Sequence, residues 1–535
     1  MSSSGIQVPH PVHHGEKIAS YRQPISEGYS KEMHEEEVLG AFSPSYHDDR
    51  LSVHQTHDST HRQLRPRHIQ LIGIGGTIGT ALLCPNWCTF ILAVTNCMAE
   101  MVTYLPISSP FIRFAGRYVD DAFGVAAGYN FFIFEAALVP FEIVACNVII
   151  HYWSDAVPAG GIIAIVIVLY GLINIFAVRC IYFHHTMLGG NPLHDRFGFR
   201  FWRTPGAFTE LYKTGSFGKF LGFLQCLIQA SFTIAGPDYV SMAAGEAQNP
   251  RVVMPRAFNG VFYRLTAFFV LGSLAVGILV PYDDQELKNA FTNGLPGAAA
   301  SPYVVAMNRL QIRILPDIVN AMVLGAAFSA GNSYVYCASR SLFGLALEGK
   351  APKVLTKCTK QGVPIYCVGI TLAIALLSFL QVSNNAAVVL QWFVNLVTAS
   401  QLINFSVMAY TFICWKRACD AQGLDRRKLP HTSFWQPFSA YYALTGCFIM
   451  TFVGGYTVFL PGSWDIPTFL FSYAMVGVFP IIFVGWKVIK KTKWLKPHEV
   501  VLRTQEVDEI DEYTRNYVER PPKTRWHGYI DRIFS

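Results

Sequence analysis

Residues 221–243 read LGFLQCLIQASFTIAGPDYVSMA, an apolar run interrupted in its middle by Gly236, Pro237 and Asp238. At about 1.5 Å per residue, a helix of this length crosses the roughly 30 Å hydrocarbon core of a bilayer. Proline has no backbone N–H to donate, so the run predicts a transmembrane helix that is broken at membrane depth. Such a break is tolerated where the backbone lines a cavity. Asp238 is then either a functional intramembrane carboxylate or the N-cap of the second half-helix, and the functional role is favoured.

The composition of the whole chain also indicates a membrane protein. Of the 535 residues, 52% are hydrophobic and 14% are charged, whereas a soluble domain carries about a quarter charged residues. The net charge of +7 comes from short basic runs between apolar segments, which is typical of cytoplasmic loops, so we expect no nucleic-acid partner. The 12 cysteines lie mostly in apolar runs without CxxC spacing, so we expect neither a disulfide framework nor a metal site.

Apolar runs of spanning length follow one another along most of the chain. Their approximate bounds are 69–84, 88–105, 123–152, 159–178, 221–243, 258–281, 316–345, 364–382, 387–414, 438–460 and 467–488. The polar residues 1–65 predict a disordered cytosolic tail. We therefore predict an all-α polytopic membrane protein, with a transmembrane domain at 66–488 and a cytosolic C-terminal tail at 489–535.

Basic residues between the runs orient the second half of the chain. The lysines within 350–360, the basic residues within 416–428 and the lysines within 487–496 follow alternate spans. The intervening segments 383–386 and 461–467 contain no Lys or Arg. Because cytoplasmic loops are enriched in Lys and Arg, the basic segments and the C-terminus are predicted in the cytosol, and Arg65 and Arg67 place the N-terminus there too.

The first half of the chain lacks one membrane crossing. The span 159–178 ends inside, near Arg179, and the span 221–243 must start outside because Arg251 and Arg256 follow it. Residues 179–219 should therefore cross the membrane, yet they carry Asp195, Arg196, Arg200 and Arg203. Each such charge costs about 2.5–3.5 kcal/mol at mid-bilayer, so this segment is not expected to span. By parity, one helix is missing.

A second glycine-rich motif, GIGGTIGT at 73–80, lies within the first apolar run. A dinucleotide-binding loop would need a preceding strand and a βαβ unit, and the apolar surroundings argue against both. Clustered glycines in a membrane helix allow close helix packing or local unwinding, and the spacing does not choose between them. If the helix unwinds, its freed N–H groups and the following half-helix would bind a carboxylate.

Polar residues in two other spans are further candidates. Glu135 and Glu142 lie two helical turns apart, and either could pair internally or carry a proton. Glu142, which follows Pro140, is the better proton candidate. Asn332 and Ser333 could hydrogen-bond across helices, or could bind substrate or ions as gate residues.

Several long strings resemble the fungal amino acid permeases of the amino acid–polyamine–organocation superfamily, in the branch that includes the proline and general amino acid permeases. They are RHIQL at 67–71 with the GIGGTIGT that follows, EMVTYLPISS at 100–109, FIRFAGR at 111–117, AGEAQNPR at 244–251 and SRSLFGLALEGKAP at 339–352. The resemblance runs from about residue 65 to 500 and implies twelve transmembrane helices, ten of them in two inverted five-helix repeats. It also implies proton-coupled amino acid uptake at the plasma membrane.

The resemblance assigns roles to the two glycine-rich motifs. The substrate carboxylate would meet Thr77, Gly79 and Thr80. The backbone carbonyls offered to the substrate ammonium would be those of Ile234, Ala235 and Gly236, with Phe232 as an aromatic gate. Asp238 stands where most relatives have Glu, and Pro237 replaces a more usual Thr.

This chain departs from the family in two places. After TIGT it continues as ALLCPNW at 81–87, where the family completes its first helix and begins its second. After residue 178 it passes through RCIYFHHT to GGNP at 189–192, where the family runs through its fifth helix. We infer two deletions, each about the length of a transmembrane helix, from mis-spliced or mispredicted exons or, second, from degeneration of a paralogue.

These observations predict a carrier and not an enzyme, one that takes up amino acids by alternating access. No cofactor is expected, and Glu142 or Asp238 would carry the coupling proton. The partners would be the amino acid, protons, membrane lipid and, on the tails, the ubiquitin-ligase machinery. Two alternatives remain open, a non-transporting amino acid sensor built on the same fold and an inactive truncated permease.

Overall fold

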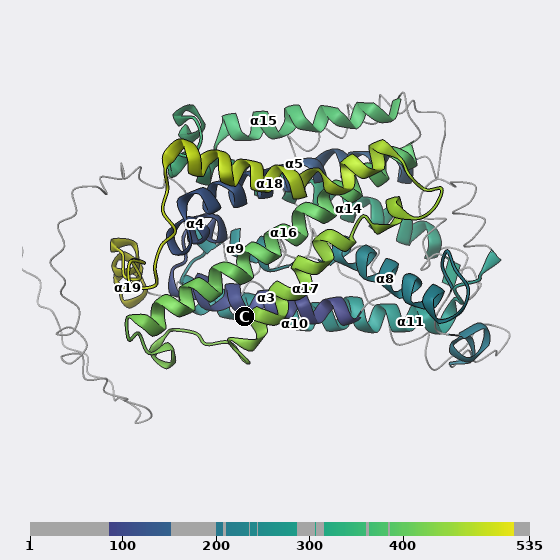
Figure 1. Ribbon diagram of the computed structural model, residues 1–535, viewed down its shortest axis with the longest axis horizontal. Helices are drawn as coiled ribbons and strands as arrows, with labels where there is room; N and C mark the ends of the chain where they lie inside the picture. The colour runs from purple at the N-terminus through teal and green to yellow at the C-terminus, as the bar shows by residue number, and fades with distance from the viewer. Residues whose placement is uncertain are drawn as a thin grey trace, which may run out of the picture. The chain divides into compact units, whose positions relative to one another are not determined.

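The computed structural model describes residues 85–150, 199–206, 210–234, 236–242, 244–285, 305–306, 315–359, 363–382 and 386–517. The regular elements of these residues are helices (Figure 1). The predicted spans 69–84 and 159–178 lie outside the described residues, and of the segment 179–219, where one crossing is missing, the structure describes only 199–206 and 210–219. The missing-helix inference therefore stays a prediction.

Each remaining predicted span coincides with one helix or with two or three consecutive helices. The single helices are α3 (Pro85–Tyr104), α5 (Asp121–Ile150), α14 (Leu315–Leu347), α16 (Ala386–Ala421), α17 (Phe438–Val453) and α18 (Ile466–Lys490). The spans that change helix type or break are α8 (Gly215–Thr233) with α9 (Pro237–Met242), α10 (Pro250–Arg264) with η3 (Leu265–Val270) and α11 (Leu271–Leu279), and α15 (Ile365–Ala375) with η6 (Leu376–Val382). The all-helical, polytopic architecture expected from the sequence is confirmed.

Shorter helices connect these spans. They are α4 (Pro110–Tyr118), η1 (Trp202–Gly206), η2 (Ala244–Glu246), η5 (Lys353–Thr356), η7 (Arg426–Lys428) and η8 (Tyr456–Phe459), and α19 (Gln505–Asn516) follows the last span.

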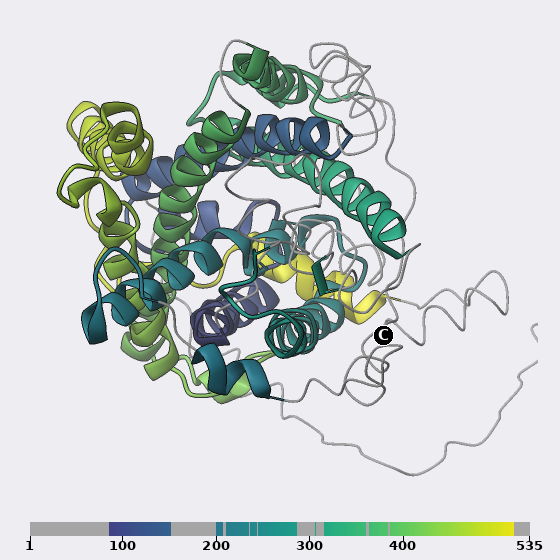
Figure 2. The same ribbon diagram turned by 90° about the vertical axis from the view of Figure 1, so that its right-hand side faces the viewer.

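Helix α5 lies at the centre of the packing, in contact with α14, α16, α18 and α4. Its pairing with α14 is visible in both ribbon views (Figures 1 and 2). The Asn130 side-chain amide on α5 donates to the Ser400 carbonyl at 2.9 Å and to Asn404 Oδ1 at 2.8 Å, both on α16. The Ser400 hydroxyl returns a bond of 3.0 Å to the Asn130 carbonyl. Buried polar groups that satisfy one another in this way fix the register of α16 on α5.

Helix α5 is largely buried inside the protein, whereas helix α18 is largely exposed. In its most apolar window, 83% of α5 is buried inside the protein, whereas 11% of α18 is. Both have the length and composition to cross a membrane, as have α8 with α9, and α16. An apolar helix that the protein itself leaves exposed is expected to face lipid. We therefore assign α18 to the lipid-facing surface.

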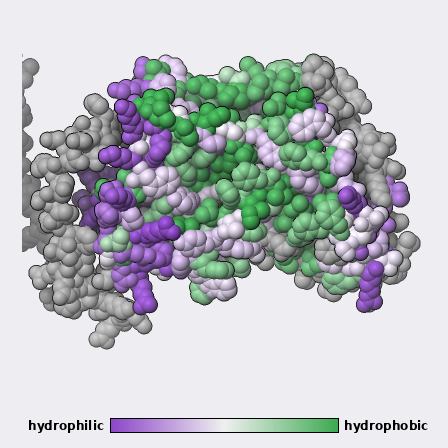
Figure 3. Space-filling model, in the orientation of Figure 1, coloured by the Kyte–Doolittle hydropathy of each residue, from purple (hydrophilic) through white to green (hydrophobic). Residues whose placement is uncertain are grey.

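Charged side chains gather where α4 and α19 lie, and hydrophobic ones cover much of the middle of this face (Figure 3). Helix α19 belongs to the predicted C-terminal tail and packs onto the other helices through buried Val507 and Ile510. Upstream of it, the Leu502 carbonyl accepts a 3.2 Å bond from the Tyr104 hydroxyl. This part of the tail is thus an ordered component of the helical domain.

Candidate functional site

The predicted break between Ile234 and Pro237 is present in the backbone. Helix α8 ends at Thr233, and Ile234 has the extended angles φ −95° and ψ 101°. The Ile234 N–H still donates to the Ala230 carbonyl at 2.9 Å, as the last bond of the first half-helix. Helix α9 then begins at Pro237, whose fixed φ and missing N–H suit the first position of a helix.

Two side chains replace the backbone hydrogen bond that the break removes. In a continuous helix the Gly236 N–H would donate to the Phe232 carbonyl. Instead, Gly236 N–H donates to Asp238 Oδ1 at 3.2 Å. On the acceptor side, the buried Gln401 of α16 turns its amide nitrogen toward α8, 3.0 Å from the Ser231 carbonyl and 3.3 Å from the Phe232 carbonyl. The hydrogen-bond network assigns this amide orientation, since the opposite one would set oxygen against oxygen.

Asp238 therefore caps the second half-helix from inside its first turn, by reaching back to the N–H of Gly236. The N-cap position that was expected for Asp238, directly before the helix, is occupied by Gly236. Its side chain is fully buried at the start of α9. A carboxylate in the first turn of a helix is also favoured by the helix dipole. The cap does not exclude a second role in substrate or proton binding, which stays a prediction.

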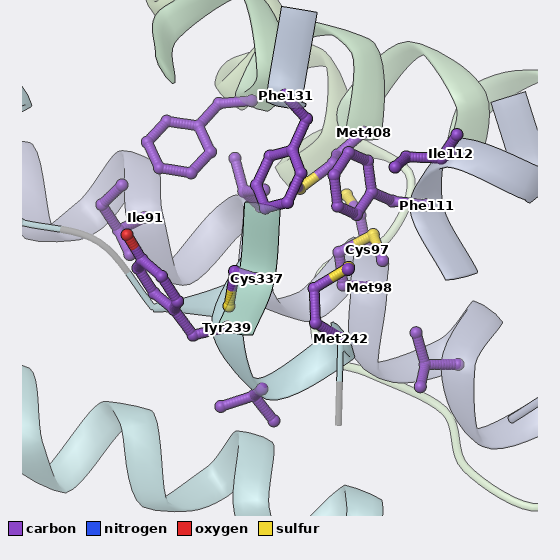
Figure 4. Packing of buried hydrophobic residues seen from close by; sticks show 14 of the residues in the cluster. Ile91, Cys97, Met98, Phe111, Ile112, Phe131, Tyr239, Met242, Cys337 and Met408 are labelled. Atoms are coloured by element: carbon purple, nitrogen blue, oxygen red, sulfur yellow. The ribbon is translucent and has the colours of Figure 1, made fainter. Parts of the chain in front are cut away.

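Helix α9 is buried along its whole length among the neighbouring helices. Tyr239 faces Tyr334 of α14, with ring centroids 5.9 Å apart. Figure 4 shows Tyr239 and Met242 within the cluster that includes Ile91, Met98 and Cys337. Close packing around so short a helix holds its N-terminal end, and with it the break, in place.

The expected residues of α5 and α14 lie near the break to different degrees. Phe141, the neighbour of Glu142 on α5, packs edge-on against Phe232 with a centroid distance of 5.2 Å. Glu142 itself is buried, at 8% exposure. On α14, which contacts α9, Asn332 and Ser333 are half-buried, and the Ser333 hydroxyl donates to the Ser329 carbonyl of its own helix at 3.1 Å. Of the two, Ser333 is thus engaged within α14.

Four of the expected substrate contacts lie outside the described residues, namely Thr77, Gly79, Thr80 and Ala235. Their roles, and those of Phe232, Ile234 and Gly236, stay predictions. An apolar cavity of about 270 Å³ lies between α5, α15 and α16, but none of these residues lines it.

Gln401 is the residue of the break that the sequence did not single out. Its signal is a polar side chain in an otherwise apolar span, close to Ser400 and Asn404. Polar residues within membrane spans usually face the protein interior and bond there. Residue spacing alone does not say which helix receives such a bond.

Several ion pairs lie in the part of the protein that includes α4 and α19, and we call this set the charged end. Glu348 accepts from Arg113 at 2.9 Å and from Lys350 at 2.8 Å, and Glu506 of α19 accepts from Arg113 at 2.7 Å and from Arg117 at 2.5 Å. The set also includes the pairs Lys350–Asp121, Arg251–Asp511, Lys487–Asp120 and Arg426–Glu100.

Ion pairs of the charged end lower the pKa of two of its carboxyl groups, Glu348 and Glu506. Burial alone would raise the pKa of Glu348, but the charges of Lys350 and Arg113 outweigh it and hold this pKa below its ordinary value. The pKa of Glu506 is likewise lowered, since Arg117 and Arg113 outweigh its burial. Both carboxyls are therefore ionised at neutral pH.

Comparison with known proteins finds relatives that cover most of the chain. The chain is 46% identical to a general amino acid permease of Saccharomyces cerevisiae, over 85% of this chain and 84% of that protein. It is 36% identical to the proline-specific permease of Emericella nidulans, over 90% of this chain and 94% of that protein. A proline-specific permease of Saccharomyces cerevisiae is 32% identical, over 88% of this chain and 82% of that protein.

The first of these alignments bears on the expected deletions. It extends over 503 positions, whereas 85% of this chain's 535 residues is about 455, nearly 50 fewer. Those positions of the relative have no counterpart here. A difference of this size is what two absent segments of helix length would produce.

The family model for amino acid permeases matches residues 69–182 and 180–499, two stretches that meet where the chain departs from the family pattern. Together with the relatives above, this match covers most of the chain. The protein belongs to the amino acid permease family.

Proposed function

We propose that the protein takes up amino acids across the plasma membrane together with protons, by alternating access to a site at the α8–α9 break. The observation that carries the proposal is the buried break at Ile234–Gly236 in a chain of the permease family. Broken helices leave backbone carbonyls and N–H groups at membrane depth, and these can bind the charged ends of a zwitterion.

The substrate would lie between the break and the 73–80 motif. The positive end of a half-helix and the N–H groups of Thr77–Thr80 would receive the carboxylate, and the carbonyls around Ile234 would receive the ammonium. Phe232, in contact with Phe141, would cover the substrate as a gate. Relatives named as proline-specific and general amino acid permeases support an amino acid as cargo.

A proton would accompany the substrate through Glu142 or Asp238. Both carboxyls are buried in the helical domain, where gaining or losing a charge changes the local interactions strongly. Both termini would lie in the cytosol, where ubiquitin-ligase machinery would act on the tails.

Uptake of radiolabelled amino acids into permease-deficient yeast tests this function. We expect saturable uptake of at least one amino acid that rises as the external pH is lowered and stops when an uncoupler dissipates the gradient. Surface expression without uptake of any amino acid would contradict a carrier and favour the sensor. Retention in the endoplasmic reticulum, relieved by restoring a helix after residue 179, would identify the chain as an inactive truncated form.

Substitutions at Asp238 separate capping from charge. Asp238→Asn keeps an oxygen for the Gly236 N–H but removes the carboxylate, whereas Asp238→Ala removes both. If Asp238 carries the proton, both variants lose pH-dependent uptake. If it only caps α9, Asn retains uptake and Ala does not. The matched control is Asp465→Asn, because Asp465 caps the exposed start of α18 by accepting from the Thr468 N–H at 2.9 Å.

The same assay applied to Glu142→Gln addresses the other proton candidate. Loss of the pH dependence with uptake retained at a single, pH-independent rate assigns coupling to Glu142. Wild-type pH dependence in this variant excludes it.

A further inference from the structure

The break in the membrane-spanning pair α8–α9 removes the helical donors of three carbonyls, those of Ser231, Phe232 and Thr233. In a continuous helix, the carbonyls of Ser231, Phe232 and Thr233 would accept from residues 235, 236 and 237. Residue 237 is a proline and has no N–H to offer. A buried carbonyl without a donor costs about 1–3 kcal/mol, so the protein must supply donors or leave them to a ligand.

One side chain satisfies the first two of these carbonyls. The amide nitrogen of Gln401 lies 3.0 Å from the Ser231 carbonyl and 3.3 Å from the Phe232 carbonyl. A carboxamide has two N–H groups, enough for one bond to each oxygen. Gln401 is 1% exposed and Ser231 is fully buried, so water does not compete for these bonds.

The neighbours of Gln401 hold it at this position. Ser400 and Asn404, on either side of it on α16, are bonded to Asn130 of α5. All four side chains are at most 1% exposed. Helix α16 is thus anchored on α5 by one polar face while Gln401 extends from another face to α8.

We propose that Gln401 is a positioning residue that fixes where the first half-helix ends, by taking the carbonyls of Ser231 and Phe232 for itself. The next carbonyl, that of Thr233, then becomes the first one that an amino acid's ammonium can reach, because Pro237 cannot donate to it. Gln401 acts through the backbone of α8 and does not itself contact the substrate. The consequence for transport rests on the proposed function, whereas the effect on the break does not.

The variant Gln401→Met tests the proposal because it keeps the length of the side chain and removes both donors. Gln391→Met is the matched control: Gln391 lies on the same helix, is exposed, and donates its amide to Asn395 Oδ1 at 2.8 Å. We expect Gln401→Met to raise the KM for uptake about tenfold, the effect of losing one or two buried hydrogen bonds, with a smaller change in kcat. The control should match the wild type.

A donor can be restored by Gln401→Glu, whose protonated carboxyl can donate to one of the two carbonyls while its ionised form cannot. Asp238, Glu135 and Glu142 are the other titratable groups of α9 and α5 in this region, and they are the same in every variant. We therefore expect the KM of Gln401→Glu, relative to wild type at the same pH, to fall as the pH is lowered. An equal defect of the Met and Glu variants at pH 4.5 and above would overturn the proposal.

Amide hydrogen exchange of the purified protein gives a readout that needs no substrate. In Gln401→Met, peptides covering 226–242 should exchange faster than in the wild type and in Gln391→Met, while peptides of α18 exchange alike in all three. If the wild type does not transport but this difference is present, the proposed function fails and the role of Gln401 stands. Unchanged exchange over residues 226–242 in Gln401→Met overturns the proposed role of Gln401, whatever the uptake.

Discussion

The α8–α9 break and the charged end satisfy buried polar groups by different means. At the break, one neutral amide and one carboxylate, Gln401 and Asp238, bond to backbone atoms. At the charged end, by contrast, Arg113 and Glu506 belong to a set of ion pairs in which each of these two side chains has two charged partners. A full charge costs several kcal/mol to bury and a neutral amide costs far less, so the buried Gln401 needs no charged partner, whereas the buried Glu348 has two, Arg113 and Lys350.

This contrast indicates what each region can do. At the break, the carbonyls of Ser231 and Phe232 receive their bonds from the neutral amide of Gln401, so no positive charge of the protein occupies the position beside them. A network of ion pairs, by contrast, joins elements far apart in the sequence, since Glu506 of α19 bonds to two arginines of α4 and Arg251 of α10 bonds to Asp511. The charged end therefore holds α4, α10 and α19 together. Four predictions test how strongly its ion pairs stabilise the protein, the last of them by comparison with an ion pair outside the charged end.

The largest expected effect is at Glu100, which is fully buried and receives two bonds from Arg426, at 2.6 and 2.8 Å. Arg426→Met leaves this carboxylate buried without its charged partner, at a cost of about 3–5 kcal/mol. We expect a large fall in the thermal unfolding midpoint of the detergent-solubilised protein. The control is Arg427→Met at the exposed neighbouring position, and equal shifts for the two variants would refute the assignment.

A smaller effect is expected where α19 docks. Glu506→Gln removes charge-assisted bonds to Arg113 and Arg117 and should weaken the docking of α19 by about 1.5–3 kcal/mol. The weaker docking should appear as faster amide hydrogen exchange in residues 505–516. Glu509→Gln is the control on the exposed face of the same helix. If α19 exchanges at the wild-type rate in both variants, Val507 and Ile510 alone hold it.

Acid should release α19 in the unmodified protein as well. The pKa of Glu506 is lower in the folded state, so its contribution is complete above the unfolded value of about 4.3 and is lost as the pH falls through the folded value. A spin label attached through Glu509→Cys should become mobile over that range. A label that stays immobile well below pH 4 would show that docking does not depend on these carboxylates.

The smallest effect is expected for the ion pair Lys416–Asp420, which is as short as the pair Arg426–Glu100 but lies on the surface. Lys416 and Asp420 lie 2.6 Å apart on α16, and the Asp420 side chain is 59% exposed. Because water screens such pairs, Lys416→Gln should change the unfolding free energy by no more than about 0.5 kcal/mol. A loss comparable to that of Arg426→Met would mean that depth does not separate the two kinds of pair.

The sequence by itself determined the helical membrane architecture, the approximate ends of the spans after residue 85 and the position of the break. These are local properties: apolar runs set the spans, and Gly236 with Pro237 cannot continue a helix. The sequence also placed the Asp238 carboxylate at the start of the second half-helix, but it did not show that Asp238 lies inside the first turn and bonds back to Gly236.

The partners of these groups were decided by the tertiary structure alone. Gln401 lies 169 positions after Phe232 along the chain, and no periodicity relates the two. Likewise, the mixed charges of the C-terminal tail do not reveal that Glu506 reaches Arg113 and Arg117. Hydrogen bonds and ion pairs across helices depend on how the helices rotate and pack against one another, and that arrangement minimises the energy of the whole set of contacts and not of any one segment.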